Sequence, residues 1–169
     1  AYLSQKANFF SDMFAEKALK LIGANIRKYV ADRTDMEACE GMMVGSLFAG
    51  IAFSHARLGD VHAMSHPVSA FFDVPHGVAN AILLPFTIRY NGTQPEKLST
   101  WPKYNYYKAA ERYAELARLL GLPAKTTAEG VESYAKACGE LGMKLGIQMN
   151  FKSQGIDEKE WMNAVEKLA

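Results

Sequence analysis

The chain has 169 residues, of which 49% are hydrophobic and 22% are charged, and its formal net charge is +1. This length suits one domain with a sizeable core, and the composition is typical of soluble globular proteins. The charge balance provides no basic field for nucleic acid and no acidic tail. No apolar run reaches the roughly 18 residues of a membrane span, and we find no signal peptide. We therefore expect no nucleic-acid partner and no membrane partner.

The two cysteines, Cys39 and Cys138, lie far apart and form no CxxC pair. This arrangement favours reduced, buried thiols in a cytoplasmic protein over a disulfide. The sequence starts at Ala1 without a methionine. We therefore expect it to be a piece of a longer protein.

Two long helices are predicted in the first third of the chain. The first begins at Ser11, a good N-cap residue, because apolar side chains then follow at helical spacing as far as Tyr29. The second begins at Thr34 or Asp35 and reaches about Arg57. This second helix is apolar on nearly every side, so we expect it in the middle of the domain.

The rest of the chain predicts further helices and no strand, because no alternation of apolar and polar residues exceeds about four positions. Residues 91–102 carry Asn-Gly and two prolines and predict a loop. The expected helices are a short one that carries His62 and His66, a buried one over 77–90 kinked at Pro85, a surface one over 105–120, one capped by Thr126 and Glu129 that reaches Leu141, and a last one capped by Asp157 and Glu160. The fold class predicted is all-α, with six or seven helices.

All four histidines lie between positions 55 and 76, as His55, His62, His66 and His76. Histidine is the commonest metal ligand and the usual proton carrier near neutral pH. His62 and His66 are four residues apart, which places both rings on one face of a helix. A turn-prone linker separates them from His76, which we expect at a helix N-terminus opposite His62. Binding of Zn²⁺ or Fe²⁺ is therefore favoured over a purely structural use of these side chains.

A catalytic metal site usually adds a carboxylate to its histidines, and Asp60 and Asp73 are the nearest ones in the sequence. Asp60 fits better as the N-cap of the helix that carries His62, and Asp73 as a turn residue. Zinc peptidases carry HExxH, whose glutamate is the general base. Ala63 follows His62 here, so the sequence argues against a peptidase.

Residues 49–91, AGIAFSHARLGDVHAMSHPVSAFFDVPHGVANAILLPFTIRYN, resemble the signature region of the iron-containing (group III) alcohol dehydrogenases. That family shows a pattern close to AGxAFxNxxLGxxHAMAHxxGxxxxxPHGxxNAxLLPxxxxxN. The segment ANFFSDMFAEKALKLI is also similar to the family's ANPxTDxxAxxAIxLI helix. The matching positions include Gly50, Phe53, Leu58, Gly59, His62, His66, Pro75, His76, Gly77, Asn80 and Pro85.

The resemblance implies a two-domain enzyme that transfers hydride between an alcohol or aldehyde and NAD(P). Its N-terminal domain would bind the nucleotide, and residues 1–169 would form its C-terminal, all-helical metal-binding domain of dehydroquinate synthase-like fold. The implied metal is divalent, with Fe²⁺ favoured and Zn²⁺ as the alternative. Without the nucleotide-binding domain, we expect the chain to be inactive by itself.

The resemblance also implies roles for individual residues. His62 and His76 match two metal ligands of the family, and an Asp and a third His come from a DAxxHAxEAY-type motif. The last two letters of that motif match the first two residues of this chain, so the other ligands would lie just upstream. His66 matches a catalytic position near the metal and the nicotinamide, with a role in proton relay or in contact with the cofactor. Phe53 matches a position that lines the substrate cleft, although a plain core role fits it equally well.

The sequence departs from the family pattern at several positions. His55 stands where the family usually has Asn, Phe86 where His is common, and Ser69 where Gly is common. Two alternatives remain open. One is a stand-alone helical metal-binding or metal-hydrolase domain that uses three of the clustered histidines together, and the other is a non-catalytic helical interaction module. Self-association into a homo-oligomer is also left open.

Overall fold

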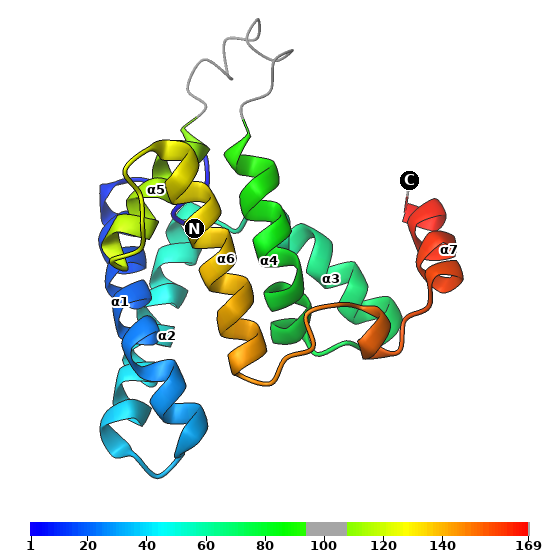
Figure 1. Ribbon diagram of the computed structural model, residues 1–169, viewed down its shortest axis with the longest axis horizontal. Coiled ribbons are helices and arrows are strands. Elements are labelled where there is room, and N and C mark those ends of the chain that lie inside the picture. Colours follow the sequence, from blue (N-terminus) through cyan, green and yellow to red (C-terminus); the bar gives the residue numbers. More distant parts are fainter. Residues whose placement is uncertain (94–107, 169) are drawn as a thin grey trace, which may run out of the picture.

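A computed structural model describes residues 1–93 and 108–168, and these residues form seven α-helices, one short 3₁₀-helix and no strand (Figure 1). The all-α prediction is therefore confirmed. The α1–α2 pair and α5 lie at one side, α6 and α4 occupy the middle, and α3 and α7 lie at the other side. The elements are α1 (Phe9–Ala31), α2 (Met36–Ala56), α3 (Asp60–Phe72), α4 (His76–Gly92), α5 (Ala109–Leu119), α6 (Thr127–Lys144), η2 (Lys152–Gln154) and α7 (Glu158–Leu168).

The helices α1 and α2 form a hairpin that small residues hold close together. Asp35, one of the two predicted starts, is the N-cap of α2, and its side chain accepts a hydrogen bond from the amide of Ala38 at 3.0 Å. A Cβ added at Gly45 would lie 2.8 Å from the side chain of Ile22 in α1. The glycine therefore allows a close approach that a larger side chain would prevent.

The prediction that α2 lies in the middle of the domain is wrong. Its buried residues are only Ala38, Gly45, Ala52 and Ala56, whereas Met36, Met43 and Leu47 are 75%, 72% and 61% exposed. Among the described helices, α2 is also the one that is long and apolar enough to cross a membrane, although we expected no such segment. Length and composition are weak evidence for a span, because core helices of soluble proteins share both properties.

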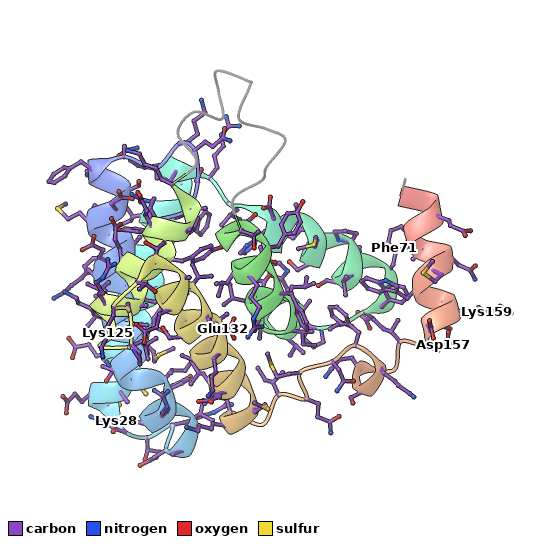
Figure 2. All side chains as sticks on the ribbon, turned by 45° about the horizontal axis from the view of Figure 1, so that its top comes forward. Lys28, Phe71, Lys125, Glu132, Asp157 and Lys159 are labelled. Atoms are coloured by element: carbon purple, nitrogen blue, oxygen red, sulfur yellow. The ribbon has the colours of Figure 1, made fainter. Side chains whose placement is uncertain are left out.

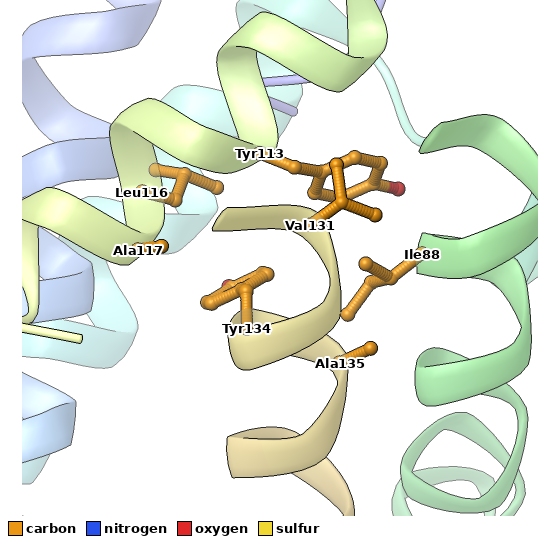
Figure 3. Packing of buried hydrophobic residues seen from close by; sticks show 7 residues of the cluster. All are labelled: Ile88, Tyr113, Leu116, Ala117, Val131, Tyr134 and Ala135. Carbon is orange, nitrogen blue, oxygen red and sulfur yellow. The ribbon is translucent and has the colours of Figure 1, made fainter. Parts of the chain in front are cut away.

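The main core lies between α4, α5 and α6. Thr126 is the N-cap of α6, as predicted, because its Oγ1 accepts a hydrogen bond from the amide of Glu129 at 3.1 Å. The Glu129 carboxylate accepts from the amide of Lys125 instead of from the cap residue. The buried side chains, drawn in Figure 3, are Ile88, Tyr113, Leu116, Ala117, Val131, Tyr134 and Ala135.

Two helix starts differ from the prediction. Asn8, not Ser11, is the N-cap of α1, and its side chain accepts from the amides of Phe10 and Ser11. Ser11 completes the capping box by accepting from the amide of Asn8 at 2.9 Å. α5 begins at Ala109, and residues 105–107 of the predicted helix and most of the predicted loop lie outside the described residues. α6 continues three residues past Leu141, the end we predicted.

The linker between the clustered histidines is shorter than predicted, because α3 continues through Pro67 as far as Phe72. Asp73 then adopts a left-handed conformation with φ 53° and ends the helix, in agreement with its predicted place in a turn. Gly59, not Asp60, is the N-cap of α3. The Asp60 carboxylate instead accepts a hydrogen bond from the side chain of Asn91 at 2.8 Å.

A second core joins α3, the start of α4 and the C-terminal region. Phe72, Trp161 and Phe151 form an aromatic stack with centroid distances of 6.1 and 5.3 Å. Asp157 caps α7 as predicted, accepting from the amide of Glu160 at 2.8 Å, and it lies at the start of that helix in Figure 2. The buried residues of this core are Val68, Val74, Ala79 and Ile156.

Candidate metal centre

Three of the four histidines meet where α3 faces the start of α4. The ring centroids of His62 and His66 are 5.8 Å apart, those of His62 and His76 are 5.2 Å apart, and those of His66 and His76 are 5.0 Å apart. His55 lies apart from this group, on α2, where its ring stacks on Phe10 at 4.8 Å. The structure therefore brings together the three residues that the sequence singled out and leaves His55 outside.

The local sequence explains this arrangement. His62 and His66 are one turn apart on α3. The turn over residues 73–75 reverses the chain, and α4 begins at His76, which confirms the predicted helix N-terminus. Val74 and Ala79, which are 4% and 0% exposed, anchor the two sides of His76 in the second core. The position of His76 is thus fixed by packing on both sides.

Asn80 bridges two of the three rings. Its amide nitrogen Nδ2 lies 3.1 Å from Nε2 of His76 and 3.5 Å from Nε2 of His62. An amide NH₂ group only donates, so both Nε2 atoms accept and carry lone pairs that converge on one position. The other amide atom, Oδ1 of Asn80, is buried without a hydrogen-bond partner. Asn80 matches the family pattern but was predicted no role in the site, although its spacing of four from His76 places both on one helix face.

The surroundings of His62 favour its neutral form. Burial lowers the pKa of His62, and positive charge on His76, on His66 and on the N-terminal amine lowers this pKa further. A neutral imidazole is the form that binds a metal ion. Two convergent, lone-pair-bearing nitrogens therefore fit a divalent metal.

The first residues of the chain are anchored close to this group. Arg112 donates from Nε to the carbonyl oxygen of Tyr2 at 2.6 Å and from Nη2 to Asp12 at 2.7 Å. The Ser4 hydroxyl donates to the carbonyl oxygen of Ala56. Burial, followed by the charge of Arg112, lowers the pKa of the N-terminal amine. The first residues are therefore held in place by contacts with α5 and with the end of α2.

The described residues do not complete a metal site. No group of three or more His, Cys, Asp or Glu side chains among them is arranged to hold a metal ion. Asp60 is engaged by Asn91, and Asp73 ends α3. Phe53 lies on α2, 43% exposed, and takes no part in the ring contacts that join the histidines. The arrangement thus brings two imidazole nitrogens, those of His62 and His76, to one amide group, with His66 beside them.

Comparison with known proteins gives the same family over the whole chain. A family profile described as "Fe-containing alcohol dehydrogenase family, C-terminal" matches residues 1–169. An aldehyde-alcohol dehydrogenase of Streptococcus pneumoniae serotype 4 is 54% identical over 169 residues, which are 100% of this chain and 19% of that protein.

Two solved structures have the same fold. The crystal structure of a 1,3-propanediol oxidoreductase matches with a TM-score of 0.82 and 35% identity, over 98% of this chain and 40% of that one. A sulfoacetaldehyde reductase from Bifidobacterium kashiwanohense in complex with NAD⁺ matches with a TM-score of 0.77 and 25% identity, over 97% and 38%.

The chain thus spans between about a fifth and two fifths of the length of these proteins. The match covers every described helix, including those that carry the three clustered histidines. The chain belongs to the Fe-containing alcohol dehydrogenase family and corresponds to its all-α C-terminal domain.

Proposed function

We propose that this domain supplies half of the metal centre of an NAD(P)-dependent, iron-containing alcohol dehydrogenase, with His62 and His76 as ligands. The observation that supports this best is the convergence of their Nε2 atoms on a single position at the amide nitrogen of Asn80. A divalent metal held by these two nitrogens, Fe²⁺ in preference to Zn²⁺, would supply Lewis-acid chemistry for the oxygen of an alcohol or aldehyde.

The remaining parts of the centre belong to chain outside these 169 residues. We expect an Asp and a third His immediately before Ala1, and the nucleotide in a preceding domain. This is supported by the relatives, which are much longer than the chain. One relative is described in complex with NAD⁺, which supports the choice of cofactor.

His66 suits the proton-transfer step. Its exposed ring stacks on His76 at a centroid distance of 5.0 Å with an interplanar angle of 26°. An imidazole in that position can take a proton released near His76 and pass it to water.

Phe53 is the proposed contact for the apolar part of a small alcohol or aldehyde, because its side chain is 43% exposed on α2. We propose the cytoplasm as the location.

The two alternative functions receive less support. A stand-alone metal domain would need His62, His66 and His76 to serve as ligands together, and the described residues hold no such three-ligand group. A non-catalytic interaction module would have no use for two imidazole nitrogens that converge on one point.

Calorimetric titration of the chain with Zn²⁺ and, without oxygen, with Fe²⁺ tests the proposal. We expect weak binding that His62→Ala or His76→Ala abolishes. His66→Ala should leave it nearly unchanged, and His55→Ala is the matched control outside the cluster. An equal loss in His66→Ala would favour the stand-alone site. Submicromolar affinity of the unaltered chain would contradict a half-site.

A further inference from the structure

Ser65 lies in the middle of α3 and is 0% exposed, between the two proposed metal ligands. Its Oγ is 3.5 Å from Nδ1 of His76 and 3.5 Å from the carbonyl oxygen of His62. A buried hydroxyl requires hydrogen-bond partners, and these two atoms are its neighbours. Both contacts are long, so they contribute little energy individually.

The hydrogen-bond roles around His76 are consistent with only one tautomer. The amide nitrogen of Asn80 lies 3.1 Å from Nε2 and donates to it, so a neutral His76 carries its proton on Nδ1. The Ser65 Oγ on the other side of the ring then accepts from Nδ1. The carbonyl oxygen of His62 can only accept, and it is the partner for the proton of the Ser65 hydroxyl.

We propose that Ser65 is a positioning residue that acts through His76. By accepting the Nδ1 proton, it keeps the ring in the tautomer whose Nε2 lone pair points to the metal position beside His62. The effect of Ser65 on the tautomer of His76 does not depend on the proposed function, whereas its effect on metal affinity rests on that function. Groups that bond the second nitrogen of a ligating histidine fix both its tautomer and its orientation.

The chain offers a matched control one turn further along the same helix. The hydroxyl of Ser69 is also buried, but it has no hydrogen-bond partner. Ser69→Ala therefore removes the same group from the same helix without touching His76, whereas Ser65→Ala removes the acceptor. Comparison of the two variants separates loss of the contact from loss of a buried hydroxyl.

The test is ¹⁵N–¹H correlation spectroscopy of the imidazoles in the full, metal-free chain at about pH 8, above the ordinary histidine pKa. We expect His76 to show a protonated Nδ1 and an unprotonated Nε2 in the unaltered chain and in Ser69→Ala. Ser65→Ala should shift its population toward the Nε2–H form. An unchanged tautomer in Ser65→Ala overturns the proposal. If Ser65→Ala does not fold, Ser65→Cys replaces the hydroxyl with a thiol of similar size that is a weaker acceptor. It should shift the tautomer population of His76 by a smaller amount. An unchanged population in Ser65→Cys would also overturn the proposal.

Zn²⁺ titration of the same variants then tests the consequence. Ser65→Ala should bind about ten-fold more weakly than the unaltered chain, at the lower end of the effect expected for such outer partners, and Ser69→Ala should bind equally well. A shifted tautomer with unchanged Zn²⁺ affinity would show that Ser65 does not position a ligand. Absence of Zn²⁺ binding by the unaltered chain, together with the tautomer shift, would refute the proposed function and leave the role of Ser65 toward His76 intact.

Discussion

Gly130 allows α5 and α6 to pack at close range, and we expect Gly130→Ala to destabilise the domain. An added Cβ would lie 2.6 Å from Cβ and 2.7 Å from Cα of Ala114. A backbone atom cannot rotate away, so α5 must move. Such overpacking costs about 1–3 kcal/mol, and the backbone contact places it at the upper end. Alanine has a higher helix propensity than glycine, which adds about 1 kcal/mol to the free energy of unfolding. The net decrease in the free energy of unfolding is therefore about 2 kcal/mol.

Gly139 provides a control on the same helix with the opposite expected sign. An added Cβ there would lie 3.6 Å from Cγ of Pro85, an ordinary van der Waals contact. Gly139→Ala should therefore keep the propensity gain of up to about 1 kcal/mol. The two variants carry the same substitution, so they differ only in what the new methyl group meets.

Urea unfolding of both variants, followed by far-UV circular dichroism, measures the difference in free energy of unfolding, which we expect to be about 3 kcal/mol. The midpoint should fall for Gly130→Ala and rise for Gly139→Ala. If Gly130→Ala were as stable as the unaltered chain, the close contact between α5 and α6 would be wrong. If Gly139→Ala were less stable, the space beside Pro85 would be wrong.

Two further predictions concern single side chains. Arg112→Ala should lower the free energy of unfolding by about 2 kcal/mol, because Arg112 pairs with Asp12 at 2.7 Å and covers the ring of Tyr2 at 3.8 Å. Arg112→Lys should restore little of this free energy, since an ammonium group cannot make the same planar contacts. A urea midpoint of Arg112→Lys equal to that of the unaltered chain would contradict this prediction. Burial raises the pKa of Cys138 to about 11. The rate of its reaction with a thiol reagent should therefore be low at about pH 8 and rise about ten-fold per pH unit up to that pKa. Equal reaction rates for Cys138 and Cys39 would refute the raised pKa of Cys138.

The helix ends that depend on local chemistry were predictable from the sequence. Asp35, Thr126 and Asp157 cap helices as expected, because an N-cap bond involves residues two or three positions apart. The start of α1 was mispredicted because Asn8 and Ser11 can both act as caps. A capping residue was correctly predicted near this position, and the structure shows that Asn8 and Ser11 together form the capping box.

Burial and side-chain partners depend on which elements meet, and they were less predictable. The apolar composition of α2 indicated a central helix, yet only the side that faces α1 is covered, and Leu47 remains 61% exposed. In the candidate site, histidine spacing was enough to bring His62 and His76 together. The contacts of Asn80 and Ser65 became visible only once α3 and α4 were placed across their short turn.

The start of the chain gives the most direct test of the half-site. The carbonyl oxygen of Tyr2 accepts a hydrogen bond from Arg112 and the Ser4 hydroxyl donates to the carbonyl oxygen of Ala56, so the first residues of the chain are held in place. An N-terminal extension of the pattern DAxxHAxE should therefore deliver its Asp and His to the same position. If each added ligand contributes at least about 1.4 kcal/mol, the dissociation constant for Zn²⁺ falls by about a hundred-fold.

The matched control is the same extension with alanine in place of its Asp and His. It should bind no more tightly than the unaltered chain, because the added length alone brings no ligand. His76→Ala in the full extension should weaken Zn²⁺ binding again, since the new ligands would act together with the old ones. Tight binding that survives His76→Ala would mean that the extension forms a separate site, and the convergence at Asn80 would then have no part in metal binding.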